Sequence, residues 1–89
     1  MKKRFSETIA DAWGVPKDVI MNIPRLTISG DKEIYIENHK GILVYTDKEI
    51  RVSTEMGILR IRGKNLRIDR IRLEDVLVSG MFSGVEYQI

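Results

Sequence analysis

The stretch LTISGDKEIYIENHKGILVY, residues 26–45, places its apolar side chains at a spacing that decides the fold. Apolar residues recur at steps of eight, and a second series follows two residues behind the first. The two series here are Leu26, Ile34 and Ile42, and Ile28, Ile36 and Val44. Eight residues make one strand and one tight turn, and every second side chain of a strand faces the same side of a sheet. The stretch therefore predicts consecutive antiparallel hairpins.

The same period continues toward the C-terminus, with Arg60 as its one polar interruption. Turn-forming residues separate the apolar pairs: Gly30-Asp31-Lys32, Asn38 to Gly41, Asp47-Lys48, Met56-Gly57, Gly63-Lys64 and Gly80. The pattern predicts a mainly β protein, an antiparallel β-meander of about seven to eight short strands rolled into a small sandwich or open barrel. The expected strands are residues 24–29, 33–37, 41–46, 49–54, 57–62, 65–70, 74–79 and 82–88.

Gly63 and Lys64 suggest a two-residue hairpin turn, which fixes a register for the strands on either side. In that register Leu59 pairs with Ile68, Ile61 with Leu66, and Arg60 with Arg67. The apolar pairs then share one face of the sheet and the arginines share the other, which explains the interruption at Arg60.

The first 23 residues differ from the rest in pattern. Phe5, Ile9 and Trp13 recur at helical spacing, so we expect a short amphipathic helix over about residues 3–13. Pro16 and Pro24 prevent its extension. The predicted organisation is an N-terminal helix and linker, residues 1–23, followed by the β-meander domain, residues 24–89. Residues 42–45 are apolar on both faces, so the helix or a second sheet should cover them. We expect the helix to do so; the alternative is a helix lying on a membrane surface.

Length and composition indicate a single globular domain. The chain has 89 residues, of which 43% are hydrophobic and 31% charged, as in ordinary folded proteins. It contains no cysteine, so disulfides and thiolate metal sites are excluded. No stretch has the length needed to cross a bilayer or the apolar core of a Sec-type signal. We therefore expect a cytoplasmic protein.

Positive charge is concentrated between residues 60 and 72. Six basic residues there stand against Asp69 alone, a local charge of +5, so the rest of the chain carries −3 of the total +2. The six are Arg60, Arg62, Lys64, Arg67, Arg70 and Arg72. One interpretation is a face that binds a phosphate-rich or acidic partner. The other is a solvated sheet face whose arginines are neutralised by Asp69 and by glutamates of other strands. No aromatic residue interrupts the segment, which argues against nucleic acid.

The only histidine, His39, lies in the segment Glu37, Asn38, His39, Lys40, Gly41. No second histidine or cysteine exists to complete a metal site with it, and the serines lack a nucleophile-elbow context. We interpret the segment as a solvated turn between strands in which Gly41 takes an unusual backbone angle. The sequence predicts no catalytic residue, no metal, no cofactor and no enzymatic activity.

These motifs in combination resemble the YabP/YqfC family of sporulation proteins, with greater similarity to its YqfC branch. The resemblance extends from ADAWGVPKDV through ENHKG and GILRIRG to VSGMFSGVEYQI. It implies a structural or adaptor protein in the mother cell of a sporulating bacterium, without known activity or cofactor. It also implies a protein partner, such as the membrane protein YqfD, at the forespore-enclosing membrane. Peripheral membrane contact and self-association through sheet edges are compatible with it, and polyanion binding by the basic face is the alternative.

Overall fold

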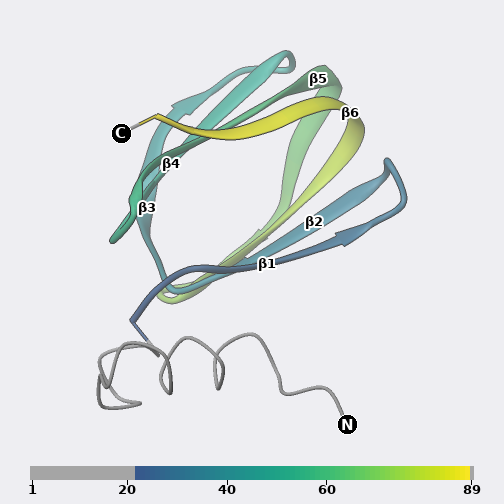
Figure 1. Ribbon diagram of the computed structural model, residues 1–89. Helices are drawn as coiled ribbons and strands as arrows, with labels where there is room; N and C mark the ends of the chain where they lie inside the picture. The colour runs from purple at the N-terminus through teal and green to yellow at the C-terminus, as the bar shows by residue number, and fades with distance from the viewer. Residues whose placement is uncertain (1–21, 89) are drawn as a thin grey trace, which may run out of the picture.

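The computed structural model describes residues 22–88, which form six strands (Figure 1). The strands are β1 (Arg25–Ser29), β2 (Glu33–Glu37), β3 (His39–Tyr45), β4 (Glu49–Thr54), β5 (Gly57–Ile71) and β6 (Asp75–Gln88). They form one open antiparallel sheet in the order β1-β2-β6-β5-β4-β3, which confirms the mainly β, antiparallel prediction. The helix expected over residues 3–13 lies outside the described residues. Within residues 22–88 no helix has the length and apolar character that crossing a membrane requires.

The predicted number of strands is wrong because two glycines mark bends and not turns. Strand β5 continues through Gly63, which pairs with Phe82, and β6 continues through Gly80. The register of the β5–β6 ladder shifts on both sides of Gly63, as expected of β-bulges that bend a strand. A Cβ atom on Gly63 would lie 2.0 Å from the carbonyl oxygen of Met81. The glycine is therefore needed for a close approach of two backbones.

The predicted register about Gly63 and Lys64 is also wrong, although the faces that it assigned are correct. Leu59 pairs with Val52 and Tyr87, while Arg60 pairs with Arg51 and Glu86. Leu59, at 0% exposure, is fully buried, while the Arg60 side chain is 28% exposed. Alternation along a strand depends only on local geometry, whereas partner choice depends on whether the chain turns or bends.

The chain departs from a simple meander between β2 and β3. A meander places consecutive strands side by side, but β2 pairs with β6, with Ile34 opposite Val78. Asn38 alone separates β2 from β3, and its φ of 64° lies in the left-handed region that asparagine tolerates. This one residue carries the chain from one end of the sheet toward the other.

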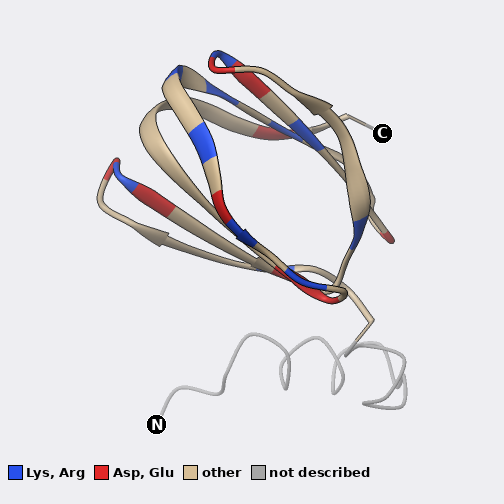
Figure 2. Ribbon diagram, turned by 180° about the vertical axis from the view of Figure 1, so that it is seen from behind, with Lys and Arg blue, Asp and Glu red and all other residues tan. Residues whose placement is uncertain are grey.

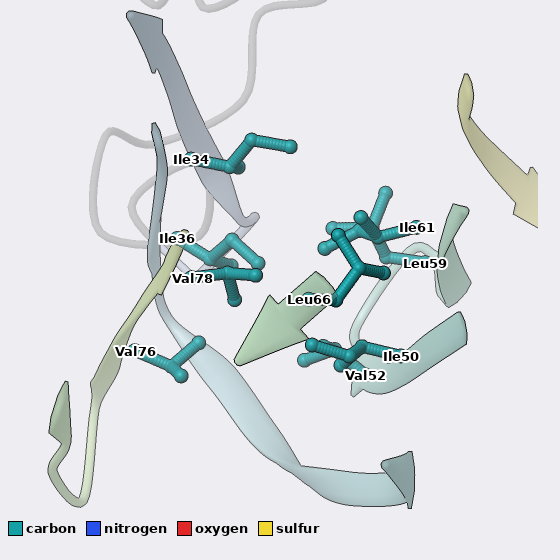
Figure 3. Packing of buried hydrophobic residues seen from close by; sticks show 9 residues of the cluster. All are labelled: Ile34, Ile36, Ile50, Val52, Leu59, Ile61, Leu66, Val76 and Val78. Atoms are coloured by element: carbon teal, nitrogen blue, oxygen red, sulfur yellow. The ribbon is translucent and has the colours of Figure 1, made fainter. Parts of the chain in front are cut away.

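The sheet curves so that its two ends face each other (Figure 1). We call β1, β2, residues 75–79 of β6 and residues 67–71 of β5 the first half. The second half is β3, β4, residues 57–62 of β5 and residues 84–88 of β6. Figure 3 shows that buried side chains of the two halves point toward each other. Ile34, Ile36, Val76 and Val78 come from the first half, and Ile50, Val52, Leu59 and Ile61 come from the second, with Leu66 between them.

Two hairpin turns supply hydrogen-bond partners to the bends. The amide of Leu66 donates to the carbonyl of Asp47, in the β3–β4 turn, over 2.8 Å. The amide of Gly80 donates to the carbonyl of Lys32, in the β1–β2 turn, over 3.1 Å. A bulge leaves backbone groups without ladder partners, and unpaired buried amides are costly. The turns therefore stabilise the curvature on which the core depends.

Candidate interaction surface

The outer face of the second half carries a row of alternating charges. Arg60 lies at its centre and donates hydrogen bonds to Glu49 from Nε at 3.0 Å and from Nη2 at 3.2 Å. Arg51 donates a further hydrogen bond to the same carboxylate. On the other side of Arg60, Glu86 lies 3.3 Å from Arg62 Nη2 and 3.8 Å from Arg60 Nη1. We call Glu49, Arg51, Arg60, Arg62 and Glu86 the charge ladder.

Gly84 allows the end of the charge ladder to form. It pairs with Arg62 across the sheet, and a Cβ atom there would lie 2.8 Å from Arg62 Nη2. The Arg62 guanidinium therefore lies against the backbone of β6 at Gly84 and reaches Glu86, two residues further along the same strand. A glycine two residues before a glutamate is the sequence feature that permits this contact.

The charge ladder lowers the pKa of the Glu49 carboxyl group. The hydrogen bond from Arg60, followed by that from Arg51, lowers the pKa of Glu49 below its ordinary value, against a smaller opposing effect of desolvation. The same bond to Glu49 raises the pKa of Arg60. Both groups thus remain charged, and three arginines against two carboxylates leave the ladder with one net positive charge.

The outer face of the first half holds a second set of paired charges. Arg72 donates to both carboxylate oxygens of Asp75, at 2.8 and 2.9 Å, and the Tyr35 hydroxyl donates to Asp75 Oδ2 at 2.9 Å. The guanidinium of Arg70 lies 6.0 Å from the centre of the Tyr35 ring, within the range of a cation–π contact. The bond from Arg72 lowers the pKa of Asp75.

The structure favours the interpretation in which acidic neighbours neutralise the basic segment. Figure 2 shows acidic and basic segments close together on the strands. Of the six basic residues, Arg60, Arg62, Arg67 and Arg72 each form an ion pair. Within residues 22–88, Lys64 and Arg70 form none. The predicted pairing of Arg60 with Arg67 is wrong, since they lie on opposite sides of the bend. Sequence reasoning allowed for neutralisation by glutamates of other strands but did not identify Glu49, Glu86 and Asp75 as the partners.

The segment Glu37 to Gly41 forms a corner between the two halves of the sheet. Glu37 ends β2 and His39 begins β3. The amides of Asn38 and His39 both donate to the carbonyl of Glu74, at 2.6 and 3.3 Å, and Asn38 Nδ2 donates to the carbonyl of Ile23 at 3.0 Å. The side chain of Lys40 forms an ion pair with Glu55. The segment thus joins the start of β1 and the β5–β6 hairpin to β3.

His39 is buried, which corrects the prediction of a solvated turn. Its exposed fraction is 9%. Nδ1 accepts a hydrogen bond from the amide of Gly41 at 3.0 Å, and Nε2 lies 2.9 Å from the carbonyl oxygen of Arg72. Because an amide only donates and a carbonyl only accepts, this geometry assigns the neutral tautomer with hydrogen on Nε2. The expected unusual angle at Gly41 is present, with φ of 135°. The partners of His39 are backbone atoms, which the sequence pattern did not reveal.

The apolar side chains of the terminal strand β3 are only partly covered. Leu43 is 55% exposed and Tyr45 is 52% exposed, while the Tyr45 hydroxyl accepts a hydrogen bond from the amide of Ile68 at 3.0 Å. Leu43 lies at a register shift between Ile42 and Val44, which directs Val44 to the outer face opposite Arg51. The surface next to β3 therefore combines an apolar margin with the charge ladder. Among residues 22–88 no group of three or more metal-binding side chains occurs.

The curved six-strand sheet with a buried histidine corner defines a small all-β protein. The model of the YabP family matches residues 22–89, so the chain belongs to the YabP family. The chain is also 38% identical over 86 residues to a Bacillus subtilis (strain 168) protein, the uncharacterized protein YqfC. The alignment covers 97% of this chain and 92% of that protein. The family predicted from the sequence motifs is confirmed.

Proposed function

We propose that this chain is a non-enzymatic sporulation protein that acts as a structural or adaptor module on a membrane-associated partner in the mother cell. Membership of the YabP family supports the proposal, since the resemblance to YabP/YqfC proteins implies a role in spore formation. A YqfD-like membrane protein is the partner that this resemblance implies. The site of action is then the mother-cell side of the forespore-enclosing membrane.

The observation that carries the docking proposal is the apolar margin of β3 beside the charge ladder. Leu43 is more than half exposed, and Val44 lies in a row with Arg51 and Arg60 on the outer face. Protein interfaces commonly combine a central apolar contact with charged and polar groups at the rim, and arginine is enriched in them. A partner that covers Leu43 and meets the ladder with its own charges fits this surface.

The assignment of a structural role rests on how the chain uses its titratable groups. Both ring nitrogens of His39 are engaged by backbone atoms, so His39 holds a corner together and is not directed at a substrate. Glu49 and Asp75 are each held by arginines. General acid or base catalysis requires such groups to be within reach of a substrate proton. Ion pairs and backbone contacts serve the fold in each of these cases.

Polyanion binding by the basic segment remains the alternative function, with weaker support. An anion that bound Arg60 or Arg67 would compete with Glu49 or Asp69. Lys64 and Arg70 are the two candidates without an ion pair among residues 22–88. Binding through so few cations would be weak and would fall with salt concentration. Reversal of Arg60 and Arg67 tests this function poorly, because it breaks ion pairs of the fold.

The test is a crosslinked pull-down of the tagged full chain from sporulating cells. The wild type is compared with Leu43→Lys and with the control Met56→Lys, which changes an exposed residue of the β4–β5 turn. Recovery of one integral membrane protein by wild type and control, with loss in Leu43→Lys, supports the adaptor function. Equal recovery by all three excludes docking through β3. Recovery of nucleic acid or lipid alone, lost in a Lys64→Glu, Arg70→Glu variant, selects the alternative function.

A further inference from the structure

The two terminal strands of the sheet differ in their ability to accept another strand. Strand β3 contains two register shifts, between His39 and Gly41 and between Ile42 and Val44. Strand β1 pairs with β2 through five consecutive residues without any shift. Bulges protect the edges of natural sheets against further pairing, whereas a regular edge presents a straight row of unpaired backbone groups. Of these two strands, β1 is the better site for strand addition.

Strand β1 also leaves apolar surface uncovered on the core side. Ile28 pairs with Ile34 and Leu26 pairs with Ile36, so both face the core, because directly opposed residues share a face. Ile34 is fully buried, yet Ile28 remains 53% exposed, since no described strand lies beyond it. An added strand would cover Ile28 if it placed an apolar side chain opposite.

The sequence of β1 is complementary to itself. In an antiparallel pair of two β1 strands centred on Thr27, the threonines face each other, Leu26 faces Ile28 twice, and Arg25 faces Ser29 twice. Apolar residues then meet on the core side, polar residues meet on the outer side, and no like charges are opposed. Threonine pairs and apolar cross-strand pairs are favourable, whereas opposed like charges are not.

We propose that two copies of this chain associate through β1, with a twofold axis at Thr27. The pairing joins two sheets into one, and Ile28 of each copy is covered by Leu26 of the other. A shift of the axis to Leu26 brings Pro24, which has no amide hydrogen, into the ladder. A shift to Ile28 brings in the turn at Gly30, where φ is 58°. The Thr27 axis is the one that uses all five residues. This association is independent of docking through β3.

The first experiment is sedimentation equilibrium of the full chain over micromolar to millimolar concentrations. We expect a monomer–dimer equilibrium for the wild type, and at least about tenfold weaker dimerisation for Ile28→Lys, because a charge at an edge blocks pairing. Leu43→Lys is the matched control, since Leu43 is 55% exposed on the other terminal strand. It should dimerise like the wild type. A wild type that stays monomeric throughout, or equal effects of both substitutions, would overturn the proposal.

A second experiment uses the absence of cysteine from the chain and does not depend on the folding of Ile28→Lys. In Thr27→Cys the two cysteines would have Cα atoms about 4.5–5.5 Å apart, within the range for a disulfide. In the control Ser29→Cys they would lie about 14 Å apart, four residues along the strands. Under mild oxidation Thr27→Cys should form a covalent dimer rapidly and Ser29→Cys slowly. Equal rates would contradict the Thr27 axis.

Discussion

The imidazole of His39 is hydrogen-bonded through Nε2 to the carbonyl oxygen of Arg72, 33 residues later in the chain, over 2.9 Å. This contact joins the first residue of β3 to the loop between β5 and β6. Since Asn38 alone links β2 to β3, the contact holds the corner at which the chain leaves one half of the sheet for the other. The histidine of the ENHKG segment is therefore a structural residue of the fold.

Replacement of His39 by alanine should destabilise the protein by about 2–4 kcal/mol, because two backbone hydrogen bonds are lost and a buried side chain is removed. The Gly41 amide and the Arg72 carbonyl would be left without their partner. Urea unfolding at neutral pH measures the change in the free energy of unfolding. The control Lys40→Ala removes the neighbouring exposed side chain and its ion pair with Glu55, at a cost of about 0–1 kcal/mol. Similar losses of stability for both variants would show that the hydrogen bonds of His39 contribute no more than the exposed ion pair of Lys40.

The tautomer of His39 is a separate prediction. The amide of Gly41 donates to Nδ1, so at neutral pH the ring should carry its hydrogen on Nε2 alone. Nitrogen-15 chemical shifts of the imidazole distinguish the two nitrogens directly, and His39 is the only histidine to assign. A signal for hydrogen on Nδ1 would mean that this corner has a different hydrogen-bond arrangement in solution.

The sequence predicted the faces of the strands better than their connections. Ile34, Ile36, Ile61 and Leu66 were assigned to one face by their spacing, and all are buried. Val44 of the same series lies on the outer face instead, because the register of β3 shifts between Ile42 and Val44. Such alternation is a local property of an extended chain. The bends at Gly63 and Gly80 were mistaken for turns, because glycine is suited to both and the choice depends on which strand lies alongside.

The candidate surface was predictable only in part. The positive charge of residues 60–72 is evident in the sequence. The glutamates that neutralise it, Glu49 and Glu86, lie on other strands and are separated from Arg60 by 11 and 26 residues in the sequence. Glu86 follows from the pairing of β5 with β6, which the misassigned turn concealed, whereas Glu49 lies on the strand expected beside residues 57–62 and was not singled out. The burial of His39 depends likewise on carbonyls of residues 72 and 74, and no side-chain motif records backbone partners.

Gly63→Ala should destabilise the protein by about 3 kcal/mol or more, because its Cβ atom would lie 2.0 Å from the carbonyl oxygen of Met81 and the backbones would have to separate. Gly84→Ala is the matched control on the neighbouring strand. Its Cβ atom would meet the end of the Arg62 side chain, which can move away, so we expect a loss of about 1 kcal/mol or less. Thermal or urea unfolding of the two variants measures the difference. A Gly63→Ala protein as stable as Gly84→Ala would mean that the bend does not require glycine.

The charge ladder predicts a loss of stability in acid that depends on Glu49. Arg60 and Arg51 lower the pKa of Glu49 in the folded protein, so the folded state binds a proton less readily than the unfolded state. The stabilisation is complete above the ordinary glutamate pKa of about 4.3 and is lost as the pH falls through the lower folded value. Glu49→Gln should lower the stability at pH 7 and make the free energy of unfolding less dependent on pH below about 4.5. Urea unfolding between about pH 2 and pH 7, a range that spans the ordinary glutamate pKa, tests both effects. The control is Glu33→Gln on β2, which forms no ion pair among residues 22–88. An unchanged acid dependence in Glu49→Gln would show that the ladder does not govern it.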